Sequence, residues 1–317
     1  MKKIKNILII LLILPQISQG QSEITKEVEN RFNTIMEQRR NNKPYKGITN
    51  EELKSSDPKK NLSSLSRFDK DSDGSVRRLA FFYEVQLANT HRTDEIRQDV
   101  TKRLVKALVE PNSNVSPHPY TFLLSFEAKD FNDASKLIIR QALDKGNSTS
   151  GIIRICGVAN IKEELPRLKE LMIDEKNDMN EPNIKNTTIW YRTTSWNARL
   201  ARARMGIKED IEMCIKLLDS EIVKNPEMIH FMLEDVGFIR QPEAINCLKK
   251  YLDSNIRLAS TNPAWEGELA AGYLIDILAD SLADFPVKKE PGRGYSLDKI
   301  NAARKWMSEQ KEWKIIR

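Results

Sequence analysis

Three stretches of the sequence can be aligned with one another. They are IIRICGVANIKEELPRLKELM at Ile152–Met172, ARLARARMGIKEDIEMCIKLL at Ala198–Leu218 and IHFMLEDVGFIRQPEAINCLKKYL at Ile229–Leu252. In each, apolar residues recur at the three- and four-residue steps of an amphipathic helix, a short turn follows, and a second such stripe begins. Each stretch is therefore predicted to form a pair of packed helices.

A glycine stands near the end of the first helix of each pair. These glycines are Gly157, Gly206 and Gly237, at an average spacing of about 40 residues, which lies within the period range of helical-pair repeats. Glycine adopts the left-handed conformation that follows a helix at little cost. The three glycines are therefore predicted to end the first helices.

Weaker copies of the same pattern extend the array in both directions. They are Val76–Leu87 with Ile96–Leu108, Tyr120–Phe126 with Ala134–Leu143, and Trp265–Leu282 with Leu297–Trp313. One pair cannot bury its apolar face alone, so about six pairs are expected to stack into one core. No sustained strand alternation is present, and the predicted class is all-α.

The N-terminal part of the chain divides into three predicted segments. Residues 1–20 are a secretory leader, and residues 21–67 hold an amphipathic helix at 22–40 and a polar linker at 41–67. The helix is expected to cap a repeat array over residues 68–317, because end repeats need a cover. Thr49 followed by Glu51 and Glu52 suits a short capped helix within the linker.

The leader has a basic start at Lys2, Lys3 and Lys5, an apolar run of eight residues, and small residues at Ser18 and Gly20. This pattern predicts a cut before Gln21 and a periplasmic or secreted protein. The alternative is a membrane anchor, but the run is far shorter than the ~20 residues that span a bilayer.

Charge and composition exclude some classes of partner. Of 317 residues, 40% are hydrophobic and 30% charged, which is typical of a surface-rich protein with a real core. The formal net charge is +6, and loss of the leader's three lysines would lower it to +3. Nucleic-acid binding needs clustered basic charge, so no nucleic-acid partner is predicted. No later segment is long and apolar enough to span a membrane.

The stretch Asp71–Leu79 reads DSDGSVRRL, with Ala80 next, and resembles the HEAT-repeat pattern of an acidic turn followed by Val-Arg and Ala. Ala198–Leu218 and the sequence from Gly237 to Ile245 are similar to the same armadillo-like family. This resemblance covers about residues 68–313 and implies a right-handed α-solenoid that binds partners on its concave face. Tetratricopeptide repeats are the near alternative, but the spacing is uneven and their Trp–Leu–Gly–Tyr pattern is missing.

The sequence offers no recognisable catalytic, metal or cofactor site. GxSxG and HExxH are absent, and His91, His118 and His230 lack zinc-type spacing with cysteine. Asp69, Asp71 and Asp73 spell the front half of an EF-hand calcium loop, although its twelfth position is Ala80 instead of Glu. Helix capping explains the same acids, and calcium stays the alternative.

The three cysteines are predicted to be free, buried thiols. They are Cys156, Cys214 and Cys247, and all fall in predicted helices. Cys214 and Cys247 occupy one place in successive second helices, whose axes lie ~8–10 Å apart. The Cα atoms of a disulfide are only ~4.4–6.8 Å apart.

The candidate binding residues lie in an aromatic and arginine-rich stretch and on the second helices. The first group is Trp190, Tyr191, Arg192, Trp196 and Arg199, residue types that dominate binding hot spots. The alternative is that Trp196, Leu200 and Ala203 are core and the arginines pair with acids. The second helices carry basic side chains that favour an acidic partner: Lys102, Arg103, Lys106, Lys136, Arg140, Lys249 and Lys250.

We therefore expect an exported, non-enzymatic scaffold that needs no cofactor and holds a protein or peptide, preferably an acidic one, on its concave face. The alternative functions are binding of a carbohydrate or envelope polymer through Trp190, Tyr191 and Trp196, or an enzyme with an unrecognised site.

Overall fold

A computed structural model describes residues 22–110, 118–172, 193–221, 229–257, 269–289 and 295–316. Within these ranges the secondary structure is helical, apart from two isolated β-bridges, Arg257 with Leu269 and Leu282 with Ile315. The predicted all-α class is therefore confirmed. No helix in this part of the chain is long and apolar enough to cross a bilayer. The predicted leader lies outside the described residues.

The chain forms two compact units. Unit 1 is Met1–Phe126 with Asp130–Ile138, and unit 2 is Glu127–Lys129 with Ile139–Arg317. The short helix η2 (Ala128–Asp130) and helix α7 (Asp133–Asp144) are each divided between the units.

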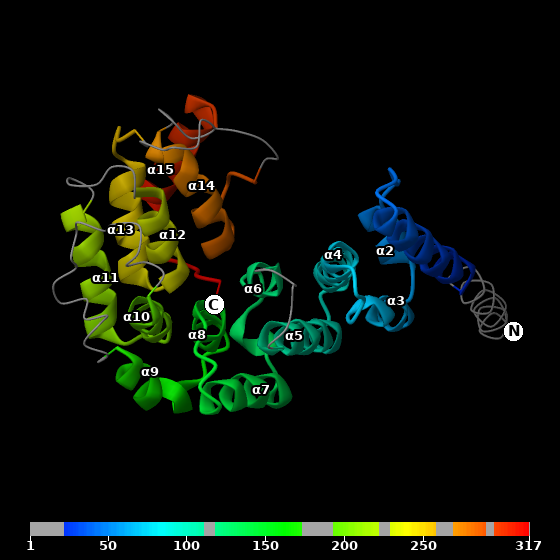
Figure 1. Cartoon of the computed structure of the whole chain (residues 1–317). Coiled ribbons are helices and arrows are strands. Elements are labelled where there is room, and N and C mark those ends of the chain that lie inside the picture. The colour runs from blue at the N-terminus through cyan, green and yellow to red at the C-terminus, as the bar shows by residue number, and fades with distance from the viewer. Residues whose placement is uncertain are drawn as a thin grey trace, which may run out of the picture. The chain divides into compact units, whose positions relative to one another are not determined.

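Unit 1 is built around one long helix. Its elements are the helix over residues 22–40, α2 (Asn50–Ser55), α3 (Pro58–Leu65), η1 (Ser66–Phe68), α4 (Gly74–His91), α5 (Asp94–Val109) and α6 (His118–Leu123). Helix α4 contacts α2, α3, α5 and α6 (Figure 1). It is accordingly buried on most sides, and Phe81 is fully covered. In the N-terminal helix, Phe32 is also fully buried, whereas Ile24 remains 38% exposed.

The segment predicted as a polar linker holds two well-capped helices. Thr49 and Glu52 form a reciprocal capping box at the start of α2, in keeping with the expected short helix. Asp57 caps α3 by accepting hydrogen bonds from the backbone of the residues that follow Pro58. Leu53 and Leu62 are buried. The apolar positions are so few that the sequence pattern resembles a linker, yet Ile48 and Leu65 are buried as well, and only Tyr45, at 37%, is an exposed large hydrophobic residue in this segment.

Unit 2 consists of helical hairpins in two layers. Its elements are α8 (Ser150–Val158), η3 (Lys162–Glu164), α9 (Leu165–Leu171), α10 (Thr194–Arg204), α11 (Lys208–Glu221), α12 (Ile229–Ile239), α13 (Pro242–Leu252), α14 (Ala270–Ser281) and α15 (Leu297–Glu309). Helices α8, α10, α12 and α14 contact one another in succession, and so do α11, α13 and α15. Partners within a hairpin, such as α10 with α11 and α12 with α13, also pack together (Figure 1).

Each first helix ends within two residues of its predicted glycine, but only one of the three glycines takes the left-handed position after the helix. Gly206 follows α10 with a φ of +93°, as expected. Gly157 and Gly237 instead lie inside α8 and α12, and the left-handed residues after those helices are Asn160 (φ 52°) and Arg240 (φ 50°). Both internal glycines serve close packing: a Cβ on Gly157 would lie 2.8 Å from Ala201 Cα.

Candidate functional site

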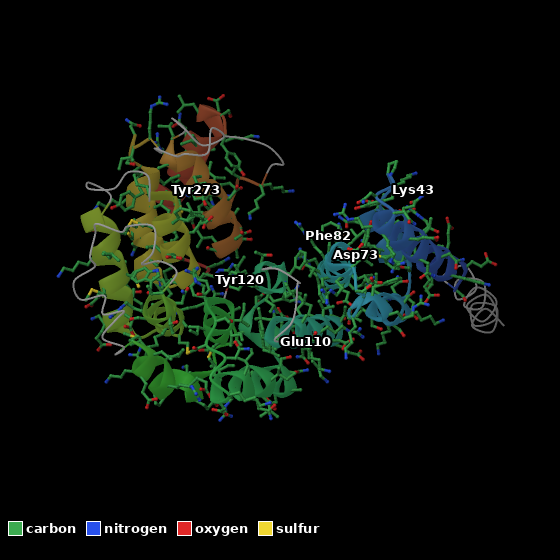
Figure 2. All side chains as sticks on the ribbon, in the orientation of Figure 1. Lys43, Asp73, Phe82, Glu110, Tyr120 and Tyr273 are labelled. Atoms are coloured by element: carbon green, nitrogen blue, oxygen red, sulfur yellow. The ribbon has the colours of Figure 1, made fainter. Side chains whose placement is uncertain are left out.

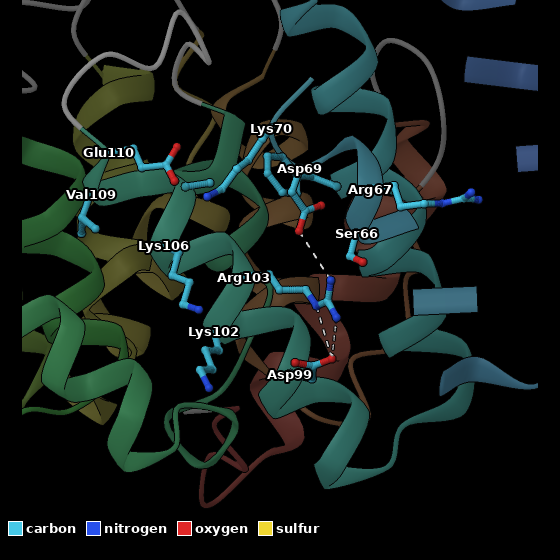
Figure 3. A pocket seen from close by; sticks show the side chains of 12 residues that line it. Ser66, Arg67, Asp69, Lys70, Asp99, Lys102, Arg103, Lys106, Val109 and Glu110 are labelled. Atoms are coloured by element: carbon cyan, nitrogen blue, oxygen red, sulfur yellow. Dashed lines mark hydrogen bonds and ion pairs between the residues drawn. The ribbon is translucent and has the colours of Figure 1, made fainter. Parts of the chain in front are cut away.

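A cleft of about 620 Å³ opens in unit 1 between the η1 region and helix α5. Helix α5 presents one face to it, because Asp99, Lys102, Arg103 and Lys106 follow the three- and four-residue steps that align side chains on a helix. Val109, which is half-buried, adds an apolar side chain to the wall. Figure 3 shows Lys102, Arg103 and Lys106 along this helix, with Asp69 and Lys70 facing them from the segment after η1.

Five basic side chains line the cleft: Arg67, Lys70, Lys102, Arg103 and Lys106. Lys70 and Lys106 are exposed, and Lys102 is half-buried. No carboxylate among the described residues lies within ion-pair distance of these three lysines. Their ammonium groups are therefore available to an anionic ligand.

Arg103 is the centre of an ion network at the base of the cleft. It donates from Nη2 to Asp99 Oδ2 over 3.1 Å and from Nη1 to Asp69 Oδ2 over 3.5 Å (Figure 3). Nη1 also lies 3.6 Å from Oε1 of Glu84, which belongs to α4 and is fully buried. One guanidinium thus faces three carboxyl groups.

Burial raises the pKa values of two of these acids, Asp69 and Glu84. Burial, and then the nearby charge of Asp69, raises the pKa of Glu84 well above its usual range, against the opposing pull of Arg103. Burial also raises the pKa of Asp69 to about 6, although Arg103 again opposes the shift. Neither Glu84 oxygen receives a hydrogen bond from a donor among the described residues. The carboxyl pair therefore favours holding a proton.

The sequence identified only one wall of this cleft. Lys102, Arg103 and Lys106 were predicted as exposed basic positions of a second helix, and the structure brings them together. Arg67, Lys70 and the Asp69–Glu84 pair were missed. The available signal was Glu84 itself, an acid inside the apolar run FFYEV at Phe81–Val85.

The three acids of the candidate calcium loop contact different partners. Asp69 faces Arg103, and Asp71 pairs with Arg40 while accepting a 2.9 Å hydrogen bond from the Asp73 backbone. Asp73 caps α4 by accepting from Ser75 N over 2.8 Å. Across the described ranges no group of three or more His, Cys, Asp or Glu side chains is placed to hold a metal ion.

The candidate aromatic stretch is only partly described. Trp190, Tyr191 and Arg192 lie outside the described residues. Trp196 is 2% exposed, and its Nε1 donates to Asp235 Oδ2 over 2.6 Å. Arg199 is also buried and donates to Asp210 Oδ1 over 3.0 Å. These positions agree with the core alternative, so Trp196 and Arg199 offer no accessible platform for a ligand.

Lys249 and Lys250 lie in α13 of unit 2. Lys250 is 64% exposed and pairs with Asp219 over 3.0 Å. Lys249 is half-buried and lies 6.0 Å from the centre of the Trp313 ring. Both therefore already have neighbours within their own unit, unlike the lysines of the cleft.

All three cysteines are free and buried, which confirms the prediction. Burial raises the pKa values of the Cys156 and Cys214 thiols well above their usual range, and that of Cys247 to about 12. Because the thiolate is the reactive form, these positions do not suit a nucleophile.

Comparison with known proteins identifies no family: no family model, no curated protein and no solved structure matches the chain. The function therefore has to be inferred from the geometry of the chain itself.

Proposed function

We propose that the protein is a non-enzymatic binding scaffold that holds an acidic segment of a protein partner in the cleft of unit 1. The observation that carries the proposal is the set of three lysines, Lys70, Lys102 and Lys106, which line an open cleft without a carboxylate partner among the described residues. Unpaired like charges repel one another, so an anionic ligand between them gains electrostatic energy.

The walls of the cleft favour a peptide over a small inorganic anion. A volume of about 620 Å³ lies in the range of sites that enclose molecules of drug size. Val109, which is half-buried, lines it beside the charges, which gives an apolar contact to a side chain next to an acidic one. A segment that mixes carboxylates with apolar residues would use both surfaces.

The fold supports a scaffold role. In unit 2 the first helices of successive hairpins contact one another, and so do the second helices. This arrangement is compatible with a HEAT-like α-solenoid, in which each pair completes the core of its neighbour. We propose that the chain is such an array and, on the basis of its predicted leader, that it acts in the periplasm or outside the cell.

Charge reversal on α5 tests the proposal. The double substitution Lys102→Glu and Lys106→Glu is expected to weaken binding of a labelled hexa-aspartate peptide at least tenfold, because two attractive contacts become repulsive. Fluorescence anisotropy at low salt measures the affinity, with a hexaserine peptide as the uncharged probe.

The matched control is Lys249→Glu with Lys250→Glu, which makes the same charge change on α13 of unit 2. It is expected to change the affinity less than twofold, beyond the general loss from the altered net charge. If the α13 variant loses binding and the α5 variant keeps it, the site lies in unit 2 and the cleft assignment is wrong. Equal small losses in both variants would mean that only net charge matters.

A further inference from the structure

We propose that capture of an acidic segment in the cleft is coupled to uptake of one proton by the Asp69–Glu84 carboxyl pair, so that the partner is held more tightly in acid than at neutral pH. This inference rests on the proposed function, because it concerns regulation of the same cleft. It makes the protein a pH-responsive carrier of its partner.

The geometry of the pair requires a proton. Asp69 Oδ2 and Glu84 Oε1 approach the same atom, Arg103 Nη1, at 3.5 Å and 3.6 Å, so the two carboxyl groups lie beside each other. An ionised carboxylate only accepts hydrogen bonds, so this contact becomes a hydrogen bond only when one of the two groups is protonated. Both Glu84 oxygens are buried and have no donor among the described residues, which leaves a shared proton as the simplest partner.

The surrounding charges decide how many protons the pair can hold. Three groups from two elements face Glu84: Asp69 from the segment before α4, and Asp99 and Arg103 from α5. Arg103 compensates one negative charge and is shared with Asp99 over 3.1 Å. Burial raises the pKa of Glu84 so far that the pair keeps one proton. Burial also raises the pKa of Asp69 to about 6, which brings uptake of the next proton toward physiological pH.

The ligand and the pair compete for the same positive charges. Asp69 lines the cleft together with Lys70, Lys102 and Arg103, so an ionised Asp69 repels an incoming carboxylate and occupies Arg103. Protonation of the pair removes that repulsion and leaves Arg103 more available to the ligand. By linkage, a ligand that prefers the protonated form must raise the proton affinity of the pair by the same factor.

The pH dependence of binding tests the inference on the full chain. The probe is the hexa-aspartate peptide, whose carboxylates, with a pKa of about 3.9, stay ionised above pH 5.5. We expect the affinity of the wild-type protein to rise about tenfold between pH 7.5 and pH 5.5, with a slope of at most tenfold per pH unit for one coupled proton. Calorimetry in two buffers of different ionisation enthalpy should show net proton uptake of up to one proton per peptide bound.

Two variants separate this inference from general effects of pH. Asp69→Asn replaces the acid that lines the cleft with a neutral group of nearly the same shape, so it should bind as tightly at pH 7.5 as the wild-type protein does in acid, with a flattened profile. Lys106→Ala should weaken binding at every pH and keep the wild-type slope. His91 does not line the cleft, its Nε2 lies 2.9 Å from Leu53 O, and Asp69→Asn leaves it intact.

Each outcome has one meaning. Absence of peptide binding at every pH would overturn the proposed function itself. Binding that depends on Lys106 but shows no proton uptake overturns only the coupling. A pH dependence that persists in Asp69→Asn assigns the proton to another group and also overturns it. If Asp69→Asn fails to fold, as judged by circular dichroism, the two-buffer calorimetry of the wild-type protein decides alone.

Discussion

Replacement of Asp235 by alanine is expected to lower the free energy of unfolding by about 3–5 kcal/mol, because it breaks a buried ion pair from one side. Asp235 of α12 is 4% exposed and accepts from Arg154 Nη2 of α8 over 2.5 Å and from Trp196 Nε1 of α10 over 2.6 Å. One carboxylate therefore ties three helices together. Burial raises the pKa of Asp235, and Arg154 opposes that shift. The buried carboxylate therefore depends on Arg154 to stay charged.

Urea denaturation followed by circular dichroism measures this loss, and Trp196 provides a local fluorescence signal. Asp280→Ala is the matched control, since Asp280 pairs with Lys289 at 2.5 Å where both side chains are about half exposed. That substitution should cost less than about 0.5 kcal/mol, as exposed pairs usually do. If the two variants lose similar amounts of unfolding free energy, the contacts of Asp235 with Arg154 and Trp196 stabilise the protein no more than an exposed ion pair does.

Gly157→Ala is expected to destabilise the protein by about 2 kcal/mol, even though alanine is the better helix former by about 1 kcal/mol. The added Cβ would lie 2.8 Å from Ala201 Cα and 3.1 Å from Ala201 O. Both are backbone atoms of α10. The steric clash can therefore be relieved only if α8 and α10 move apart, because rotation of a side chain would not remove it. The loss of contact between two closely packed helices then outweighs the gain in propensity.

Thermal unfolding of Gly157→Ala should be compared with that of Gly272→Ala. Gly272 also lies in a helix, α14, but a Cβ there would meet its nearest neighbour, Tyr295 N, at 3.9 Å, an ordinary contact. Gly272→Ala should therefore leave stability unchanged or raise it by a few tenths of a kcal/mol. A stabilised Gly157→Ala protein would mean that the two helices are not in close contact.

Local chemistry made the secondary structure predictable. The stripe of Val28, Phe32, Ile35 and Met36 has the helical period, and all four side chains are buried. Thr49 and Glu52 form the capping interaction that their spacing suggests. Even the core alternative for Trp196 followed from its spacing to Leu200 and Ala203, since i, i+4 and i+7 positions share one face.

Roles that depend on a neighbouring helix were not predictable. Gly157 and Gly206 stand at similar places in the aligned pairs, yet one lets two helices approach and the other ends a helix with positive φ. The sequence does not say which helix lies opposite a given glycine. For the same reason the polar segment after residue 41 resembled a linker, although Leu53 and Leu62 are buried in helices that pack against α4.

By itself, the sequence determined that this chain is helical, that its helices come in pairs, and that basic residues follow one face of α5, because each of these properties is set by residues three or four positions apart. Only the tertiary structure decided that Glu84 of α4 meets Asp69 and Arg103, or that Asp235 joins α8 to α10. Those contacts join residues far apart in the chain. Their energies come from burial and from the count of charges within a few ångströms, which arise only when the helices have packed.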